Sequence, residues 1–363
     1  MKISIITMHA ARNYGAVLQT YALQFFLEKK GCSVDVVDYR RKNQTFWGYL
    51  FNVNAKFKSS LVRSLAFIAK SFLPKLRTSN LFSAFLKRKI NLTVPVKSSN
   101  DIASKVKSDL YCTGSDQVWN PIANNGFDPS YFFSGLTPKV SYAASIGLHN
   151  LSDDYKTELK NFLSTYNSVS IRELSSKNIL NDIKIDSEVV LDPTLLLNRE
   201  NWDQFADFST VPNFKYLLVY YFGNNRDIMK TAADIAYKKH LRVVRLSVAF
   251  DNYNEDDVVF RFITPEQFVA LFSKASFVLT NSFHGTAFSI NYGIDFLSYP
   301  TTENNARFDS IFDMFDLHYR NLRKVENPSV AADMPIDWNS VKDILEKQRE
   351  FSYKFIEDKI LCC

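Results

Sequence analysis

This sequence of 363 residues has few cysteines and no long apolar run, and each absence excludes some classes of protein. The four cysteines show neither metal-ligand spacing nor a disulfide framework, and they are Cys32, Cys112, Cys362 and Cys363. No apolar segment approaches the ~20 residues of a membrane-spanning helix. The chain starts Met-Lys and enters an apolar strand at once, so we expect no signal peptide. These features predict a cytoplasmic protein.

Several ligand-binding motifs are also missing. No G-x-G-x-x-G follows the first predicted strand, so a dinucleotide is not indicated. The chain contains no Asp-x-Asp, which argues against a metal-dependent sugar-nucleotide site, and we expect neither a metal nor a cofactor. No helix-turn-helix, zinc-finger or RNA-binding pattern is present, so nucleic acid is not an expected partner.

Positive charge, in contrast, is concentrated in one segment. Residues 40–107 hold 15 Lys and Arg and a single acid, which gives +14 and leaves −8 for the rest of a chain whose total is +6. The segment also carries Phe, Trp, Tyr and Leu at loosely helical spacing, which predicts a basic helical insertion. Two interpretations stay open. Either the insertion is a surface for an anionic partner, such as lipid head groups or a diphosphate, or it is a solvated helical segment whose aromatic face packs into the protein core.

Apolar runs and helix-period patterns alternate along the chain, as in parallel α/β proteins. A strand at 2–7, a helix at 16–30 and a strand at 33–37 form an opening βαβ unit, and a second series of strands and helices begins near 168. We therefore predict an α/β fold of two Rossmann-like lobes facing a cleft. The expected parts are an N-terminal domain at 1–168 that holds the basic insertion, a C-terminal domain at 169–335, and a helix at 336–363 that packs back on the first lobe.

The segment that best suits a ligand site lies in the second half. Residues 277–280 read as a buried strand, 281–285 as a polar turn and 286–291 as a short helix. A strand, turn and helix in this order aim backbone N–H groups at the loop, where an anion is favoured. His284 lies in this turn. It is either a functional group or a histidine satisfied inside an ordinary strand-to-helix connection.

Other polar residues follow predicted strands. Asn13 lies in the loop after the first strand, Ser115 and Asp116 follow the strand at 109–112, and Arg172 follows the strand at 169–171. Because parallel strands end at one edge of a sheet, these residues are expected at the cleft. For Asp116 a plain loop cap is an equal alternative, and for Arg172 the alternative is an ion pair between the lobes.

Seven short motifs, in this order and spacing, resemble those of the polysaccharide pyruvyl transferase family over nearly the whole chain. They are Asn13-Tyr-Gly15, Gly114-Ser-Asp-Gln-Val-Trp-Asn120, Ser141-Tyr-Ala-Ala-Ser145, Ser170-Ile-Arg-Glu173, Leu191-Asp-Pro-Thr194, Ser282-Phe-His-Gly285 and Asn305-Ala-Arg-Phe308. The resemblance implies a glycosyltransferase-B-like fold. It also implies transfer of a pyruvyl group from phosphoenolpyruvate to a sugar as a ketal, in bacterial capsule or exopolysaccharide assembly.

The resemblance also implies a donor site. Phosphoenolpyruvate carries a phosphate and a carboxylate, so its site needs fixed cations and oriented N–H groups. Arg172 offers a bidentate fork, and Ser282, Gly285 and Thr286 surround the expected helix start. Other branches of the family carry Arg-x-His where this chain has Ser282-Phe-His284. Arg307 is the nearest later arginine that could replace the missing guanidinium.

Catalysis requires a proton to leave the attacking sugar hydroxyl and a proton to reach C3 of the donor. Histidine, with an ordinary pKa of about 6.5, suits both transfers, so His284 and Arg172 are the expected catalytic residues. The expected acceptor-binding residues are Asn13, Tyr14, Ser115 and Asp116.

The expected partners are phosphoenolpyruvate, a sugar acceptor linked to a lipid diphosphate, and an anionic membrane touched peripherally by the basic insertion at the inner membrane face. One rival is a metal-independent glycosyltransferase-B sugar transferase, with Glu303 holding a ribose. Another is a non-catalytic scaffold that recruits partners through the basic insertion.

Overall fold

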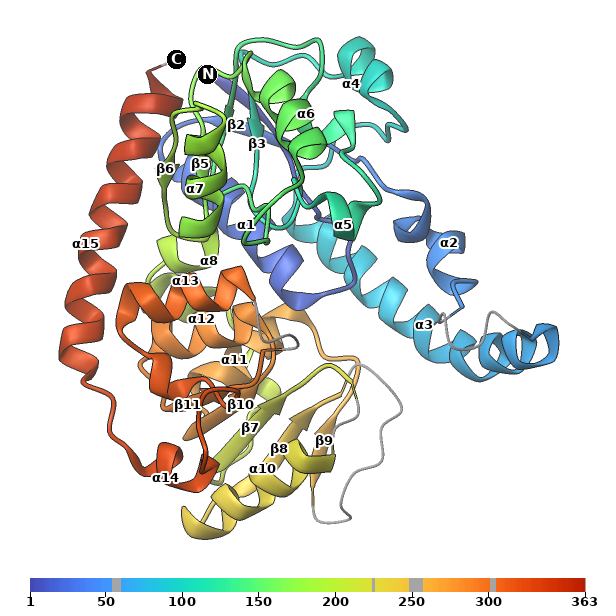
Figure 1. Cartoon of the computed structure of the whole chain (residues 1–363). Coiled ribbons are helices and arrows are strands. Elements are labelled where there is room, and N and C mark those ends of the chain that lie inside the picture. The colour runs from blue at the N-terminus through green and yellow to red at the C-terminus, as the bar shows by residue number, and fades with distance from the viewer. Residues whose placement is uncertain (54–59, 224–225, 248–256, 301–304, 363) are drawn as a thin grey trace.

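The computed structural model describes residues 1–53, 60–223, 226–247, 257–300 and 305–362, which form two α/β lobes (Figure 1). The first lobe has a parallel sheet with strand order β2-β1-β3-β4. Its strands are β1 (Lys2–Ile6), β2 (Ser33–Val36), β3 (Leu110–Thr113) and β4 (Lys139–Ser141). Helix α1 (Tyr14–Lys29) connects β1 to β2, so the opening βαβ unit is confirmed.

Two short strands extend this lobe past the expected boundary at 168. β5 (Ser170–Ile171) pairs in parallel with β6 (Glu188–Val189), and the bridges Val140–Ser168 and Ala144–Ile171 place β5 beside β4. Residues 169–189, assigned from sequence to the second lobe, therefore lie with the first. A short apolar run indicates a buried strand but not which sheet it joins, because burial does not specify the neighbour. The helices of this region are α6 (Asp153–Leu163) and α7 (Leu174–Asp182).

The second lobe has a parallel sheet with strand order β11-β10-β7-β8-β9. Its strands are β7 (Tyr216–Tyr220), β8 (Arg242–Leu246), β9 (Val258–Phe260), β10 (Phe277–Thr280) and β11 (Phe296–Ser298). All five residues of β7 are buried, as expected for a central parallel strand. The helices are α10 (Arg226–Lys238), α11 (Pro265–Ser273), α12 (Phe283–Tyr292), α13 (Ala306–Phe315) and α14 (Pro328–Asp333).

One apolar core runs through both lobes. Helix α1 contacts α8 (Pro193–Leu196), α11 and α12. The Tyr14 ring stacks on Phe268 with 4.6 Å between centroids, and the Tyr21 ring lies 4.6 Å from that of Phe205, on α9 (Arg199–Phe205). Aromatic pairs of this kind stabilise a fixed geometry in addition to burying area. The lobes are therefore held together by apolar packing behind the cleft.

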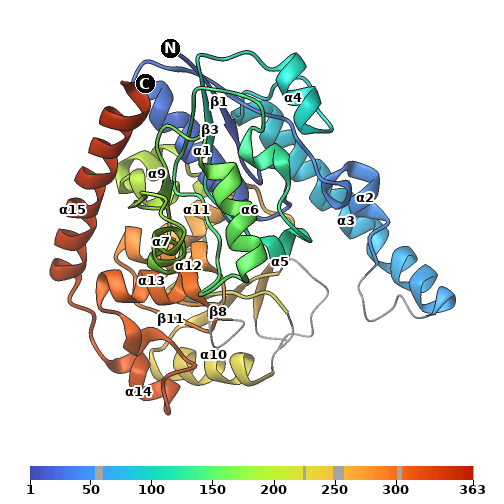
Figure 2. The ribbon, with the colours of Figure 1, turned by 45° about the horizontal axis from the view of Figure 1, so that its top comes forward.

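The final helix, α15 (Trp338–Ile356), runs along one side of the molecule and continues as a π-helical turn at Glu357–Leu361 (Figures 1 and 2). Its end packs on α1, because Tyr353 stacks on Phe26 at 4.9 Å and the Lys30 ammonium lies 2.6 Å from Glu357. At its start the Trp338 indole donates to Asp295 of the second lobe at 3.1 Å. The predicted return of this helix to the first lobe is confirmed.

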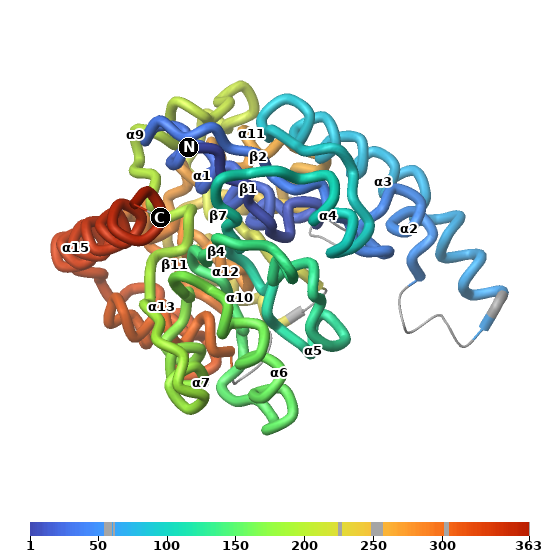
Figure 3. Tube along the Cα trace, turned by 90° about the horizontal axis from the view of Figure 1, so that it is seen from above, coloured from blue at the N-terminus to red at the C-terminus, as the bar shows by residue number. Residues whose placement is uncertain are grey.

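The basic insertion contains α2 (Phe46–Leu50), α3 (Leu61–Lys89) and α4 (Ser99–Lys105), so its helical character is confirmed for the described residues. The C-terminal half of α3 is held to the body through buried Phe82 and Phe85 and through an ion pair of 2.5 Å between Arg88 and Glu266. Its N-terminal half projects from the body on the side away from α15 (Figure 3). Among the described helices, none has both the length and the apolar composition that crossing a bilayer requires.

Candidate active site

Helix α12 brings His284 to the cleft. The helix begins at Phe283, three residues before the expected start, because Ser282 caps it and its hydroxyl accepts from the Gly285 N–H at 3.3 Å. A side chain at Gly285 would not fit, since an added Cβ would lie 2.5 Å from the Thr280 hydroxyl oxygen. His284 therefore lies in the first turn of the helix rather than in a loop.

This early start changes the roles expected of the neighbouring residues. The Gly285 N–H is paired with the Ser282 side chain, and the Thr286 N–H donates to the Ser282 carbonyl at 3.0 Å. The Thr286 hydroxyl is buried against Ser298 at 2.7 Å. Both N–H groups are thus engaged inside the helix, contrary to the expectation that they bind a donor anion.

The ring of His284 packs against the first lobe at Gly15. A Cβ added to Gly15 would lie 2.0 Å from His284 Nδ1, so only glycine lets the start of α1 approach this closely. Asn13 caps α1 by accepting from the Ala16 N–H at 3.3 Å. The positive ends of two helices, one from each lobe, consequently meet at His284, which is 6% exposed.

A buried carboxylate connects the expected catalytic residues. Asp192 Oδ2 accepts from Arg172 Nη1 at 2.7 Å and from the Ser115 hydroxyl at 3.0 Å, and it lies 3.7 Å from His284 Nε2. Burial alone would raise the pKa of Asp192. The nearby His284, the charge of Arg172 and the hydrogen bond from Thr194 outweigh burial and hold this pKa well below its usual range. Asp192 is therefore an anion that fixes Arg172 beside His284.

Glu173 is a second buried carboxylate in this network. Its Oε1 accepts from the Gly147 N–H at 2.7 Å and from the hydroxyls of Ser145 and Ser176 at 3.0 and 2.6 Å. The other oxygen, Oε2, lies 3.8 Å from Arg172 Nε. Glu173 thus ties the loop after β4 to the start of α7 and leaves one oxygen facing Arg172.

Several polar atoms here are buried without a hydrogen-bond partner. They are Nε and Nη2 of Arg172, Oε2 of Glu173, Nε2 of His284 and Nε of Arg307. Arg172 and Arg307 line one half-open space of about 20 Å³, room for about one water molecule. Burial and the nearby Arg172 lower the pKa of Arg307. Buried polar atoms are normally paired, so this cluster indicates a place where a ligand or water binds.

Of the expected acceptor residues, Asp116 is the one whose charge acts on this cluster. Its backbone is left-handed, with φ of 75°, and its carboxylate accepts from the Gln117 N–H at 2.8 Å. Burial lowers the pKa of Arg172, but the charges of Asp192, Glu173 and Asp116, in decreasing order of size, together raise it above its ordinary value. Asp116 therefore both caps its loop and lies close enough to the cluster for its charge to act there.

The other expected acceptor residues are engaged elsewhere. Tyr14 is buried between the lobes, where burial raises its pKa and its hydroxyl donates to the Ile263 carbonyl at 2.9 Å. The expectation that Tyr14 binds a sugar is therefore corrected: it is an interlobe packing residue. Ser115 is fully buried against Asp192. Asn13 remains partly exposed while it caps α1.

Sequence reasoning missed Asp192, Glu173 and the contact of Gly15 with His284. The segment Asp192-Pro-Thr194 reads as a turn, and Asp192 does cap α8 by accepting from the Thr194 N–H at 2.9 Å. The second oxygen of Asp192 holds Arg172, and this contact depends on the packing of segments that are distant in sequence. Glu303, proposed to hold a ribose, lies outside the described residues.

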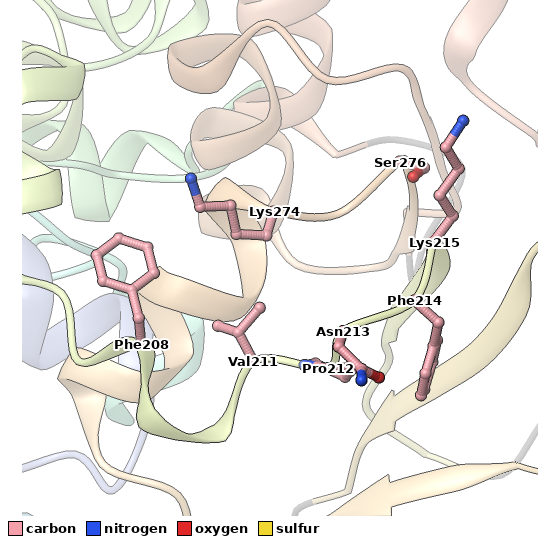
Figure 4. A pocket seen from close by; sticks show the side chains of 8 residues that line it. All are labelled: Phe208, Val211, Pro212, Asn213, Phe214, Lys215, Lys274 and Ser276. Carbon is pink, nitrogen blue, oxygen red and sulfur yellow. The ribbon is translucent and has the colours of Figure 1, made fainter.

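A more open hollow lies elsewhere, around Val211, Phe214 and Lys274 (Figure 4). It is bordered by Lys215 and Ser276, which immediately precede β7 and β10. Ligands of open parallel sheets bind at the carboxyl ends of the strands, and this hollow is at the opposite ends. The cluster around His284, directly after β10, is therefore the stronger candidate.

Comparison with solved structures identifies the architecture. A putative UDP-N-acetylglucosamine 2-epimerase from Listeria monocytogenes is similar with a TM-score of 0.52 and 11% identity over 96% of this chain and 90% of that chain. The UDP-GlcNAc 2-epimerase from Methanocaldococcus jannaschii gives 0.50 and 12% over 97% and 100%. These likenesses concern the fold alone and confirm the glycosyltransferase-B-like arrangement of two lobes.

Sequence comparison goes further than the fold. No curated protein matches the chain. The family model described as "Polysaccharide pyruvyl transferase" matches residues 13–302, a span that includes Arg172, Asp192 and His284. Because this match covers most of the sequence, the chain belongs to the polysaccharide pyruvyl transferase family.

Proposed function

We propose that the protein transfers a pyruvyl group from phosphoenolpyruvate to a sugar, forming a ketal, in the synthesis of a bacterial capsule or exopolysaccharide. The observation that carries this proposal is the pair of guanidiniums, Arg172 and Arg307, that line one space and have buried N–H groups without a hydrogen-bond partner. Phosphoenolpyruvate presents two anionic groups close together, and two cations at one spot suit such a molecule better than a singly charged ligand.

In this proposal Arg172 and Arg307 hold the donor. Asp192 occupies only Nη1 of Arg172 and Nε faces Glu173 at 3.8 Å, so Nη2 stays available to a carboxylate or phosphate. Arg307 supplies the second cation, in place of the arginine that other branches carry at the position of Ser282. The space between the arginines is small, so side chains around it must move aside when the donor enters.

His284 performs the proton transfers. A sugar hydroxyl adds to C2 of phosphoenolpyruvate, and His284 takes its proton and delivers a proton to C3, which becomes a methyl group. A second hydroxyl then attacks C2, its proton passes by way of His284 to the phosphate, and the protonated phosphate departs with the bonding electrons as the ketal closes. Asp192, 3.7 Å from Nε2, is placed to stabilise the imidazolium formed between these steps.

The acceptor is proposed to be a sugar linked to a lipid diphosphate at the cytoplasmic face of the membrane. The insertion lies on the side of the molecule away from α15 and touches the loop that ends at Asn13, through hydrogen bonds of Arg12 to the Gln44 carbonyl and the Ser79 hydroxyl. Asn13 and Asp116, the partly exposed residues of the first-lobe loops, are the proposed acceptor contacts.

The test is replacement of His284. His284→Ala should fold with a melting temperature near that of the wild type, yet lose turnover by ~100-fold or more, as general acid–base catalysts do. Product is followed by mass spectrometry as a pyruvyl ketal on lipid-linked sugars incubated with phosphoenolpyruvate. The matched control is His318→Ala, since His318 is exposed and pairs with Asp313 at 2.6 Å. Full activity of His284→Ala contradicts the assignment.

Donor binding separates the rival functions. Phosphoenolpyruvate should raise the melting temperature of the wild type, whereas a nucleoside diphosphate should not. The reverse result indicates a metal-independent sugar transferase. Stabilisation by neither compound, together with no product, indicates a non-catalytic scaffold.

A further inference from the structure

The projecting half of the basic insertion carries an unusual surface. No Asp or Glu occurs between Asp38 and Asp101, so helices α2 and α3 are entirely without acids. Their exposed apolar side chains are large, which is uncommon for a solvated excursion. Trp47 is 63% exposed on α2, and Val62, Leu65 and Leu73 are 76%, 57% and 63% exposed on α3.

These side chains form one continuous stripe. Val62, Leu65 and Leu73, with Ala66 and Ala69 between them, follow i, i+3, i+7 and i+11 spacing, which places them on one face of α3. The aromatic residues of α2 extend this face. Trp47 stacks on Phe51 at 5.8 Å, and Phe51 lies 6.4 Å from Phe72, two turns beyond Leu65.

Basic residues border the stripe along its length. Arg63, Lys70 and Arg77 recur every seven residues on α3, and all three are exposed. A helix with an apolar stripe beside lysines and arginines is typical of segments that lie in the interface of an anionic bilayer. We propose that this docking face, formed by Trp47, Phe51, Val62, Leu65, Leu73, Arg63 and Lys70, binds the surface of an anionic membrane.

Charge favours a membrane over a second copy of the chain. Two such faces brought together would place arginines and lysines against each other without any acid from α2 or α3 to offset them. The remainder of the molecule has a net charge of −8, so an anionic surface attracts the insertion and repels the rest. This asymmetry orients the docking face toward the bilayer.

The docking face is also connected to the site. Arg12 donates to the Gln44 carbonyl and to the Ser79 hydroxyl at 3.3 Å, and its guanidinium lies 4.5 Å from the centre of the Tyr49 ring. Arg12 belongs to the loop that ends at Asn13, so the loop and the insertion are fastened together. Delivery of a lipid-linked acceptor to this loop rests on the proposed function, whereas membrane binding itself does not.

Vesicle sedimentation of the full chain tests the proposal. The wild type should bind vesicles of equal parts phosphatidylcholine and phosphatidylglycerol at low salt, be released at high salt, and not bind phosphatidylcholine alone. Leu65→Gln with Leu73→Gln, and separately Arg63→Gln with Lys70→Gln, should each weaken binding by ~10-fold or more. Because these positions are exposed, the melting temperature should not change.

Matched controls place the same kinds of change elsewhere. Tyr237→Gln with Val330→Gln replaces exposed apolar residues of α10 and α14, and Lys342→Gln with Lys347→Gln replaces exposed cations of α15. Both controls should bind like the wild type. Equal binding to both vesicle types, no binding, or equal loss in the controls overturns the proposal. So does a dimer in solution that Leu65→Gln with Leu73→Gln dissolves, because a second copy then occupies the face.

Activity on a water-soluble sugar acceptor separates the two proposals. The docking-face variants should keep wild-type turnover with such an acceptor, since their residues lie outside the cluster around His284. Vesicle binding without any pyruvyl transfer removes the proposed function and leaves the docking face intact.

Discussion

At the scale of single residues, the site depends on a buried anion, Asp192, that pairs with Arg172 and lies 3.7 Å from His284. Asp192 is fully buried, and its carboxylate serves Arg172, Ser115 and Thr194 at once. Removing one member of a buried ion pair leaves an uncompensated charge, at a cost of about 3–5 kcal/mol. Asp192→Asn should therefore destabilise the fold by that amount at neutral pH. The exposed Asp182, paired with Lys156 at 3.0 Å, supplies the control Asp182→Asn, which should cost about 1 kcal/mol or less.

The same pair predicts a pH dependence. The pKa of Asp192 is lower in the folded protein than its unfolded value of about 3.9. Its stabilising contribution is therefore complete above that value and is lost as the pH falls further toward the folded pKa. Urea unfolding from pH 7 to pH 3 should show the gap between wild type and Asp192→Asn narrowing only below about pH 4. A gap that stays constant contradicts this account.

The two arginines predict a division of labour in donor binding. Arg172→Lys keeps a charge for Asp192 but loses the fork, and Arg307→Gln removes the second cation. Each change should weaken binding of phosphoenolpyruvate by ~10- to 100-fold, the worth of a hydrogen bond to a charged group. Calorimetric titration measures this, with the exposed Arg199→Gln as the control. Unchanged affinity in Arg307→Gln means that Arg307 does not replace the arginine missing at Ser282.

At the scale of elements, the start of α1 and the start of α12 must meet without a side chain between them. Alanine favours a helix more than glycine does, so Gly15→Ala would stabilise α1 if space allowed. The added Cβ instead lies 2.0 Å from His284 Nδ1. We expect Gly15→Ala to lower both the melting temperature and turnover.

A double variant distinguishes this collision from a general defect in α1. Gly15→Ala with His284→Ala removes the obstructing ring, so it should recover the melting temperature without recovering activity. If the double variant is no more stable than Gly15→Ala, the ring is not the cause.

Much of the element order could be predicted, because apolar periodicity reports burial directly. The strand predicted at 277–280 has the boundaries of β10, and the helix predicted at 16–30 differs from α1 by two residues at its start and one at its end. The start of α12 was misplaced by three residues, because the polar run 281–285 resembles a turn until Ser282 is recognised as a cap. The neighbour of β5 could not be predicted, since pairing of β5 with β6 depends on contacts across the sheet.

The candidate site was only partly predictable for the same reason. His284 and Arg172 follow strand ends, and strand ends can be located from sequence. The link between them is Asp192, which local pattern identifies only as a helix cap. Tyr14 lies in a loop motif yet points into the interlobe core, because the facing Phe268 comes from α11, more than two hundred residues later.

At the scale of the whole molecule, the lobes share one apolar core, and one long helix, α15, contacts both of them. The largest core cluster includes Ile3 of β1, Phe268 of α11 and Phe355 of α15. Helix α15 adds polar contacts, since Arg349 donates to the Leu195 carbonyl at 2.8 Å and to the Asn291 side chain at 2.9 Å. Elements that bury one another's surface do not open separately at low cost.

This shared core predicts a single cooperative unfolding transition for the described fold, despite its two lobes. Scanning calorimetry should give one heat-absorption peak whose calorimetric and van't Hoff enthalpies agree. Phe268→Ala, in the shared core, and Phe132→Ala, in the separate cluster of the first lobe, should each cost about 3–5 kcal/mol. Both should shift the whole peak downward, because the shared core couples the lobes. If the lobes unfold independently, Phe132→Ala will move one of two peaks and leave the other in place.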